Sequence, residues 1–149
     1  MASQTIENHR DNAEVYYGDV CKSKSLELLA QIDLPNGLLP LEDISEVGYN
    51  RETGFVWLKQ KKTTTHVFKT IGKHVSYGTE ITAFVEKHKM KKLTGVKTKE
   101  ILIWVTIGDI YIEANDEKKI AFKNPQTGIS RSFPVTAFLV ADDQKKGEN

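Results

Sequence analysis

The sequence predicts a mainly β fold: an antiparallel β-barrel or sandwich of about eight strands with one N-terminal α-helix. One segment near the start has helical spacing of apolar residues. After Pro40 the chain alternates short β-branched or aromatic runs with Gly, Asn and Pro turns. A length of 149 residues suits one domain. We divide the chain into a flexible N-terminus (1–12), a single helix-plus-barrel domain (13–140) and a polar C-terminal tail (141–149).

The stretch "GDVCKSKSLELLAQIDLPNG" (18–37) is typical of a helix. Asp19 is the expected N-cap, and Pro35 ends the helix because the residue before proline resists the α conformation. Four apolar residues approximate one stripe of that helix: Val20, Leu26, Leu29 and Ile32.

Strands and turns follow. Residues 44–60 predict a hairpin whose loop is 50–54, and 65–71 a short strand. Residues 76–89 show two-residue alternation, which indicates a longer strand.

The second half of the chain predicts two or three strands over 90–113. Within it, "ILIWVTI" (101–107) is apolar on both faces and is interpreted as a strand. Residues 118–135 predict a hairpin that turns at "NPQTG", and 135–140 a last strand.

The segment "LPNGLLPLED" (34–43) holds leucines between two prolines and so suits neither a helix nor a central strand. Two roles are compatible with it. Leu38, Leu39 and Leu41 plug one end of the barrel, or they form a lid that moves about Gly37.

Charge is unevenly distributed although the whole chain carries only +1. The net charge is −6 over residues 1–58, +9 over 59–99 and −2 over 100–149. Lysines at 59–62 and 87–92 form one basic rim if the strands pair locally. Such a rim either keeps strand edges soluble or attracts anionic membranes, whereas nucleic acid is an unlikely partner because arginine and interleaved aromatics are lacking.

The single cysteine, Cys21, excludes an internal disulfide. The first residues do not resemble a signal peptide, and no apolar run is long enough to span a membrane. We therefore expect a cytoplasmic monomer without a transmembrane segment.

Several quoted pieces are together distinctive: "LPNGLLP", the "GY…TGFVWL" hairpin, "KLTGVK" and "SRSFPV". In this order, from about Ala13 to Phe138, they resemble the plant family called domain of unknown function 538. The resemblance implies a helix packed on an antiparallel barrel, likened to one half of the bactericidal/permeability-increasing lipid-binding proteins. It also implies an association with stress responses, and chlorophyll binding or hydrolysis as an activity.

Candidate chemistry in the residues is sparse. The spacing of His66, His74 and His88 is not that of a zinc site, so no metal and no cofactor is expected. There is no G-x-S-x-G elbow and no phosphate loop. An esterase acting on a hydrophobic ester such as chlorophyll is one alternative, with Ser130 or Ser132 as nucleophile. Its base is then His66 or His74.

The favoured function is a non-enzymatic binding protein for a lipid-like or other hydrophobic ligand, with a lysine-rimmed protein- or membrane-surface module as a further alternative. Strands apolar on both faces need cover, which is either a filled core or a cavity. The residues expected to contact a ligand are apolar: Leu38, Leu39, Trp57, Phe84 and Trp104. Those expected to steer toward an anionic surface are Lys89, Lys91 and Lys92.

Overall fold

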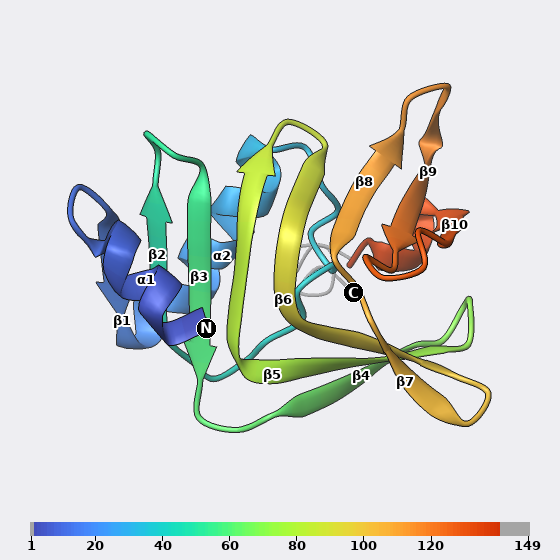
Figure 1. Ribbon diagram of the computed structural model, residues 1–149, viewed down its shortest axis with the longest axis horizontal. Coiled ribbons are helices and arrows are strands. Elements are labelled where there is room, and N and C mark those ends of the chain that lie inside the picture. Colours follow the sequence, from blue (N-terminus) through green and yellow to red (C-terminus); the bar gives the residue numbers. More distant parts are fainter. Residues whose placement is uncertain (1, 141–149) are drawn as a thin grey trace, which may run out of the picture.

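A computed structural model describes residues 2–140, in which a ten-stranded antiparallel sheet carries helices on its two faces (Figure 1). The prediction of a mainly β fold is confirmed. The helical elements are α1 (Ala2–Arg10), η1 (Gly18–Val20), α2 (Cys21–Gln31) and η2 (Val135–Phe138). The strands are β1 (Glu14–Tyr17), β2 (Ile44–Asn50), β3 (Phe55–Gln60), β4 (Thr64–Phe68), β5 (Lys73–Glu86), β6 (Lys89–Glu100), β7 (Ile103–Thr106), β8 (Asp109–Glu113), β9 (Asp116–Lys123) and β10 (Ser130–Pro134).

The sheet does not close on itself, so the prediction of a barrel was wrong. The strand order is β1-β2-β3-β5-β6-β8-β9-β10, with β4 added to β5 and β7 added to β6. In the described part of the chain, β1 pairs only with β2 and β10 only with β9. The two long strands, β5 and β6, pair with different strands along their length, which gives a bent sheet with a side arm.

The bend lies where β5 and β6 pass two glycines. Their register shifts between Tyr77 and Thr82, and Gly95 has a φ of 85°. A Cβ atom on Gly95 would lie only 2.3 Å from the Glu80 carbonyl oxygen, so no other residue fits without movement. Beyond the bend, residues 73–77 of β5 and 96–100 of β6 pair with β4 and β7. We call this four-stranded part the arm.

Helix α1 covers one face of the sheet, although residues 1–12 were expected to be flexible. Ile6 is completely buried in a small cluster with Phe55 and Trp57. The Asn50 side-chain amide donates hydrogen bonds to the carbonyl oxygens of His9 and Asp11, at 3.1 and 3.3 Å. One apolar residue and one amide are thus among the contacts that dock a segment whose composition is otherwise polar.

Helix α2 covers the other face, with a phase that differs from the predicted one. Leu29 and Ile32 are buried as expected, whereas Val20 and Leu26 are exposed. The N-cap of α2 is Val20 without a side-chain cap, so Asp19 does not cap it. The stripe toward the sheet instead includes Cys21 and Leu28, which are joined to the main core.

The segment after α2 enters this core. Leu38, Leu39 and Leu41 are all buried, and the hydroxyl of buried Tyr77 donates a 2.8 Å hydrogen bond to the Leu38 carbonyl oxygen. The Gly37 amide donates to the Phe138 carbonyl oxygen at 2.7 Å. The leucines are thus core residues, and since the sheet is open there is no barrel end for them to plug.

The local turns are largely as predicted. The hairpin over 44–60 is present, with Gly54 at a φ of 82°, and so is the one that turns at 124–128. Two predicted strands differ. Ile101 and Leu102 form a turn ahead of β7, and residues 135–138 form η2 rather than a strand. The described residues form ten strands where about eight were expected, and the predicted tail at 141–149 lies outside them.

Candidate functional site

A groove of about 350 Å³ lies between the arm and the β9–β10 hairpin. Two parts of the chain that are distant in sequence form its walls, namely residues 98–107 and 122–133, with Lys73 from β5. Its lining residues are Lys73, Thr98, Glu100, Ile103, Trp104, Val105, Thr106, Ile107, Phe122, Asn124, Gln126, Thr127, Ile129, Arg131 and Phe133.

Apolar side chains dominate the walls. Trp104 on β7 is 42% exposed, and Ile129 across the groove is 62% exposed. Phe122 and Phe133 meet edge to face, with ring centroids 5.8 Å apart. An amphipathic tryptophan beside a packed aromatic pair is a surface on which an apolar ligand loses contact with water.

Charged groups gather at one edge of the groove. Glu100 lies 3.0 Å from the Lys73 ammonium group and 3.4 Å from the Arg131 guanidinium group. These residues come from β6, β5 and β10, so the ion pairs join the arm to the β9–β10 hairpin. The group of three carries a net charge of +1, which favours an anionic head on a bound molecule.

An asparagine turn shapes the far wall. The Asn124 side chain donates to the Thr106 carbonyl oxygen at 2.8 Å and accepts from the Thr127 amide at 2.8 Å. It fixes the 124–128 turn against β7 because the same side chain bonds to both. The groove is consequently bordered by hydrogen-bonded backbone on this side.

Of the five predicted contact residues, only Trp104 lines this groove. Leu38 and Leu39 pack inside the core. Trp57 is completely buried beneath α1, where the half-buried Phe84 packs against the same cluster. The structure therefore separates the two tryptophans onto different parts of the sheet.

The lysines predicted to steer toward anionic surfaces lie away from the groove. Lys91 pairs with Glu86 at 2.9 Å, and the ammonium groups of Lys89 and Lys92 lie near the rings of Tyr111 and Phe84, at 5.7 and 5.8 Å. The expectation of one shared rim was wrong. Lys59 pairs with Glu80 in the middle of β5. Lys89 and Lys91 instead pair with Glu86 and Phe84, at the end of β5.

The residues considered for catalysis do not form a nucleophile–base pair. The Ser132 hydroxyl donates to the Glu113 carboxylate. The His66 ring packs edge-on against Phe68, with centroids 4.6 Å apart, and burial lowers its pKa. Among residues 2–140, no hydrogen bond joins Ser130 or Ser132 to His66 or His74.

Other chemistry is equally sparse. The Cys21 thiol is buried and donates to the Tyr16 carbonyl oxygen at 3.3 Å, and burial raises its pKa. No group of three His, Cys, Asp or Glu side chains suited to a metal ion occurs within the described residues. None of the helices in that part of the chain is long and apolar enough to cross a membrane.

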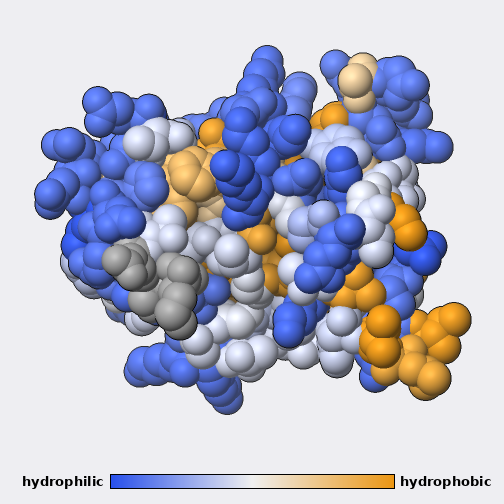
Figure 2. All heavy atoms as spheres, in the orientation of Figure 1, coloured by the Kyte–Doolittle hydropathy of each residue, from blue (hydrophilic) through white to orange (hydrophobic). Residues whose placement is uncertain are grey.

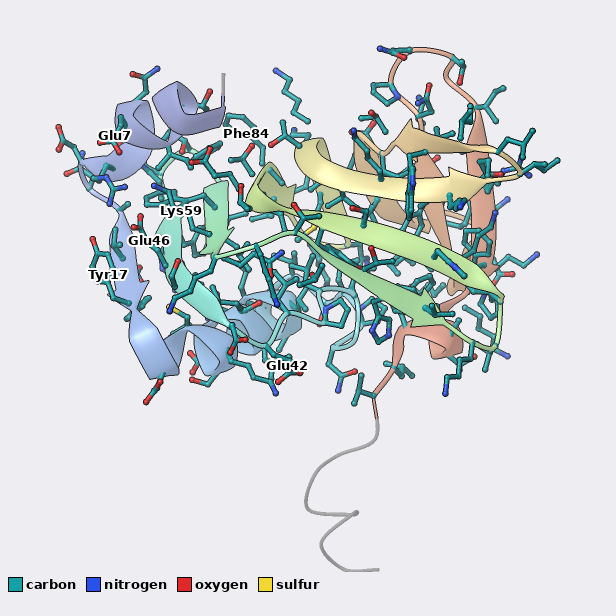
Figure 3. The ribbon with its side chains drawn as sticks, turned by 90° about the horizontal axis from the view of Figure 1, so that it is seen from below. Glu7, Tyr17, Glu42, Glu46, Lys59 and Phe84 are labelled. Atoms are coloured by element: carbon teal, nitrogen blue, oxygen red, sulfur yellow. The ribbon has the colours of Figure 1, made fainter. Side chains whose placement is uncertain are left out.

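A second polar cluster lies under α1. The Glu46 carboxylate accepts a 2.8 Å hydrogen bond from the Trp57 indole and a 2.9 Å one from Arg10. Figure 3 shows Glu46 between Tyr17 on β1 and Lys59 on β3, its partners across the strands. Burial acts to raise the Glu46 pKa, but the bonds from Trp57 and Arg10, with the charge of Lys59, lower it on balance. This cluster holds α1 on the sheet.

Sequence reasoning missed most of the groove. Lys73, Glu100 and Arg131 meet only because β5, β6 and β10 are brought together by the folded sheet. The partner of Arg131 is not identifiable from sequence spacing, because Glu100 lies on a different strand, distant in the chain. The available signal in the sequence was an isoleucine, Ile129, directly after the "NPQTG" turn.

Comparison of the chain with known proteins identifies its family but no function. The family model described as "Protein of unknown function, DUF538" matches residues 25–139, which is most of the chain. Searches of curated proteins and of solved structures found no similar protein.

Proposed function

Since this chain belongs to the DUF538 family of proteins of unknown function, we propose its function from the groove itself: it binds a lipid-like ligand there and performs no chemistry on it. The observation that carries the proposal is the combination of an apolar wall with a cationic edge. Trp104 and Ile129 are exposed to an incoming apolar chain, and Lys73 and Arg131 lie where a carboxylate or phosphate head would end.

The size of the groove narrows the class of ligand. Pockets for small molecules range from about 300 to 1,000 Å³, and about 350 Å³ lies near the lower limit. This favours an amphiphile with a single chain over a macrocyclic pigment. We also propose the cytoplasmic location expected from the first residues of the sequence and the stress-related role implied by the family resemblance.

The two tryptophans provide a direct test. Trp57 is buried and bonded to Glu46, so its emission is a constant reference, whereas Trp104 lies half exposed in the groove. Titration with oleate is expected to shift the emission to shorter wavelength and to saturate. An emission spectrum that does not change, together with no rise in melting temperature, would contradict the proposal.

A second test places a charge in the groove. Ile129→Asp changes an exposed loop residue, so the fold tolerates it while the apolar wall is lost. We expect oleate affinity to fall at least about tenfold, since one apolar side chain withdrawn from water contributes about 1.5–3 kcal/mol. Leu26→Asp, at an exposed leucine of α2 outside the groove, is the control and should bind as the native protein does.

A further inference from the structure

The turn between β6 and β7 exposes apolar side chains to an unusual extent. Ile101 is 94% exposed, Leu102 88% and the adjoining Ile103 63%. We call these three residues the hairpin tip. Figure 2 shows hydrophobic side chains gathered at the lower right of the molecule, where the β6–β7 turn projects in Figure 1. An exposed apolar patch on a projecting element indicates an interaction surface.

The turn itself does not require these residues. Hairpin turns of two residues favour small or polar residues, Asn and Gly above all. The other two-residue turns of the sheet follow this tendency toward polar or small side chains, with Lys87–His88 between β5 and β6 and Ala114–Asn115 between β8 and β9. At the hairpin tip both positions are instead branched and apolar.

The surroundings of the hairpin tip are cationic. The β4–β5 turn lies at the same end of the arm, because Lys73 beside it forms an ion pair with Glu100 beside the tip. Lys69, Lys97 and Lys99 are exposed around this end. Glu100, the only acidic residue within 69–77 or 96–106, is already paired with two cations.

An aromatic residue lies just behind the tip. Trp104 is opposite Lys99 in the β6–β7 register, and the Lys99 ammonium group lies 5.8 Å from the ring centroid. Tryptophan and lysine are enriched at the level of lipid headgroups, where one end of each side chain is apolar and the other is hydrated.

We propose that the hairpin tip inserts into the interface of a lipid bilayer that contains anionic lipid, with the surrounding lysines against the headgroups. The order along the arm fits this occupant: the three apolar residues of the hairpin tip come first, and Trp104 and Lys99 follow side by side at the next level. A bilayer receives a convex apolar tip without a preformed pocket, and its negative charge complements the lysines. The hairpin tip shares Ile103 with the groove, but Ile101 and Leu102 do not line the groove, so their insertion into a bilayer is separate from ligand binding.

The test uses co-sedimentation with vesicles of phosphatidylcholine, alone or mixed with phosphatidylserine. The native protein should bind the mixed vesicles more tightly, and the binding should weaken as salt is added. The decisive variant combines Ile101→Asn with Leu102→Gly, which removes two apolar side chains of the tip and replaces them with residues common in two-residue hairpin turns. We expect its affinity for mixed vesicles to fall at least about tenfold.

The matched control makes the same exchange at another turn. Ala114→Asn with Asn115→Gly alters the β8–β9 turn without loss of a large apolar side chain, and vesicle binding should stay at the native level. The groove variant Ile129→Asp should keep most vesicle binding while it loses oleate, so the two proposals fail separately.

Two outcomes overturn the docking proposal. The first is a native protein that does not bind mixed vesicles, and the second is a tip variant that binds them as tightly as the native protein. If the native protein does not bind vesicles but self-associates, and the tip variant does not self-associate, the tip is assigned to a protein contact instead.

Discussion

At the scale of single residues, Glu46 shows how one carboxylate fixes the position of a helix. Its hydrogen bonds to Arg10 on α1 and to Trp57 on β3 connect the helix to the sheet, and its side chain is only 13% exposed. Gly48 on the same strand makes room for this arrangement, because a Cβ atom there would lie 2.1 Å from the Trp57 ring. The contacts favour the charged carboxylate over the neutral one.

The lowered Glu46 pKa predicts a specific loss of stability in acid. A carboxyl whose folded pKa is depressed contributes stability above its ordinary value of 4.5, and that contribution disappears as the pH falls through the folded pKa. Glu46→Gln should reduce the free energy of unfolding by about 1–2 kcal/mol at neutral pH. The difference from the native protein should shrink below pH 4.5 in urea titrations.

The control for this prediction is Glu52→Gln in the exposed β2–β3 turn. Its free energy of unfolding should be nearly equal to that of the native protein at each pH, from neutral to acidic. A difference between Glu46→Gln and the native protein that stays constant down to strong acid would contradict the role of the charge.

At the scale of elements, the segment 34–41 is held by backbone contacts as much as by its leucines. A Cβ atom on Gly37 would lie 2.5 Å from the Phe138 carbonyl oxygen, and Asn36 exchanges two hydrogen bonds with the backbone of Val140. Gly37 is therefore a site of close approach between two segments that are about a hundred residues apart in the chain.

Gly37→Ala should accordingly separate these segments. We expect a loss of about 1–3 kcal/mol in the free energy of unfolding, since the clash is with backbone and cannot be relieved by a side-chain rotation. Hydrogen exchange at the amides of residues 37 and 140 should accelerate together. Gly72→Ala in an open turn is the control. Its φ of 64° gives it a local cost of its own, but hydrogen exchange at residues 37 and 140 should stay at the native rate.

The elements also show what the sequence could and could not predict. The 44–60 hairpin was predictable because its turn residues and alternation are local, and Gly54 has the left-handed conformation expected of it. Helix α1 was not, because it is docked by a few contacts with distant strands, namely buried Ile6, the Asn50 amide and the Arg10–Glu46 ion pair. The phase of α2 was misread since the small residues Cys21 and Ser25 face the sheet while Leu26 faces water.

The groove was largely beyond local pattern. Trp104 was identified from its apolar run, but its neighbours depend on the pairing of distant strands. A strand apolar on both faces was taken to need cover on each side. The structure instead ends β6 at Glu100 and leaves the next two residues exposed in a turn.

At the scale of the whole molecule, the Lys73–Glu100–Arg131 contacts join the arm to the end of the main sheet. Glu100→Gln should weaken this attachment because it removes the charge that both cations share. The free energy of unfolding should change by about 1 kcal/mol or less, as for ion pairs that water still reaches. Amide exchange in β7 and β10 should nevertheless accelerate.

Glu86→Gln provides the comparison, because Glu86 also pairs with a lysine but within one hairpin. It should leave exchange in β7 and β10 at the native rate. Equal acceleration in both variants would contradict a joining role for Glu100.

The two long strands that bend at Gly95 have a consequence for how the chain folds. Hairpin β5–β6 is local in sequence and borders both the arm and the main sheet, so either part can grow from it with little further loop closure. We expect the transition state for folding to contain this hairpin, with φ-values near the bend higher than those in β1 or β10. A single hairpin is then the nucleus for both the arm and the rest of the sheet.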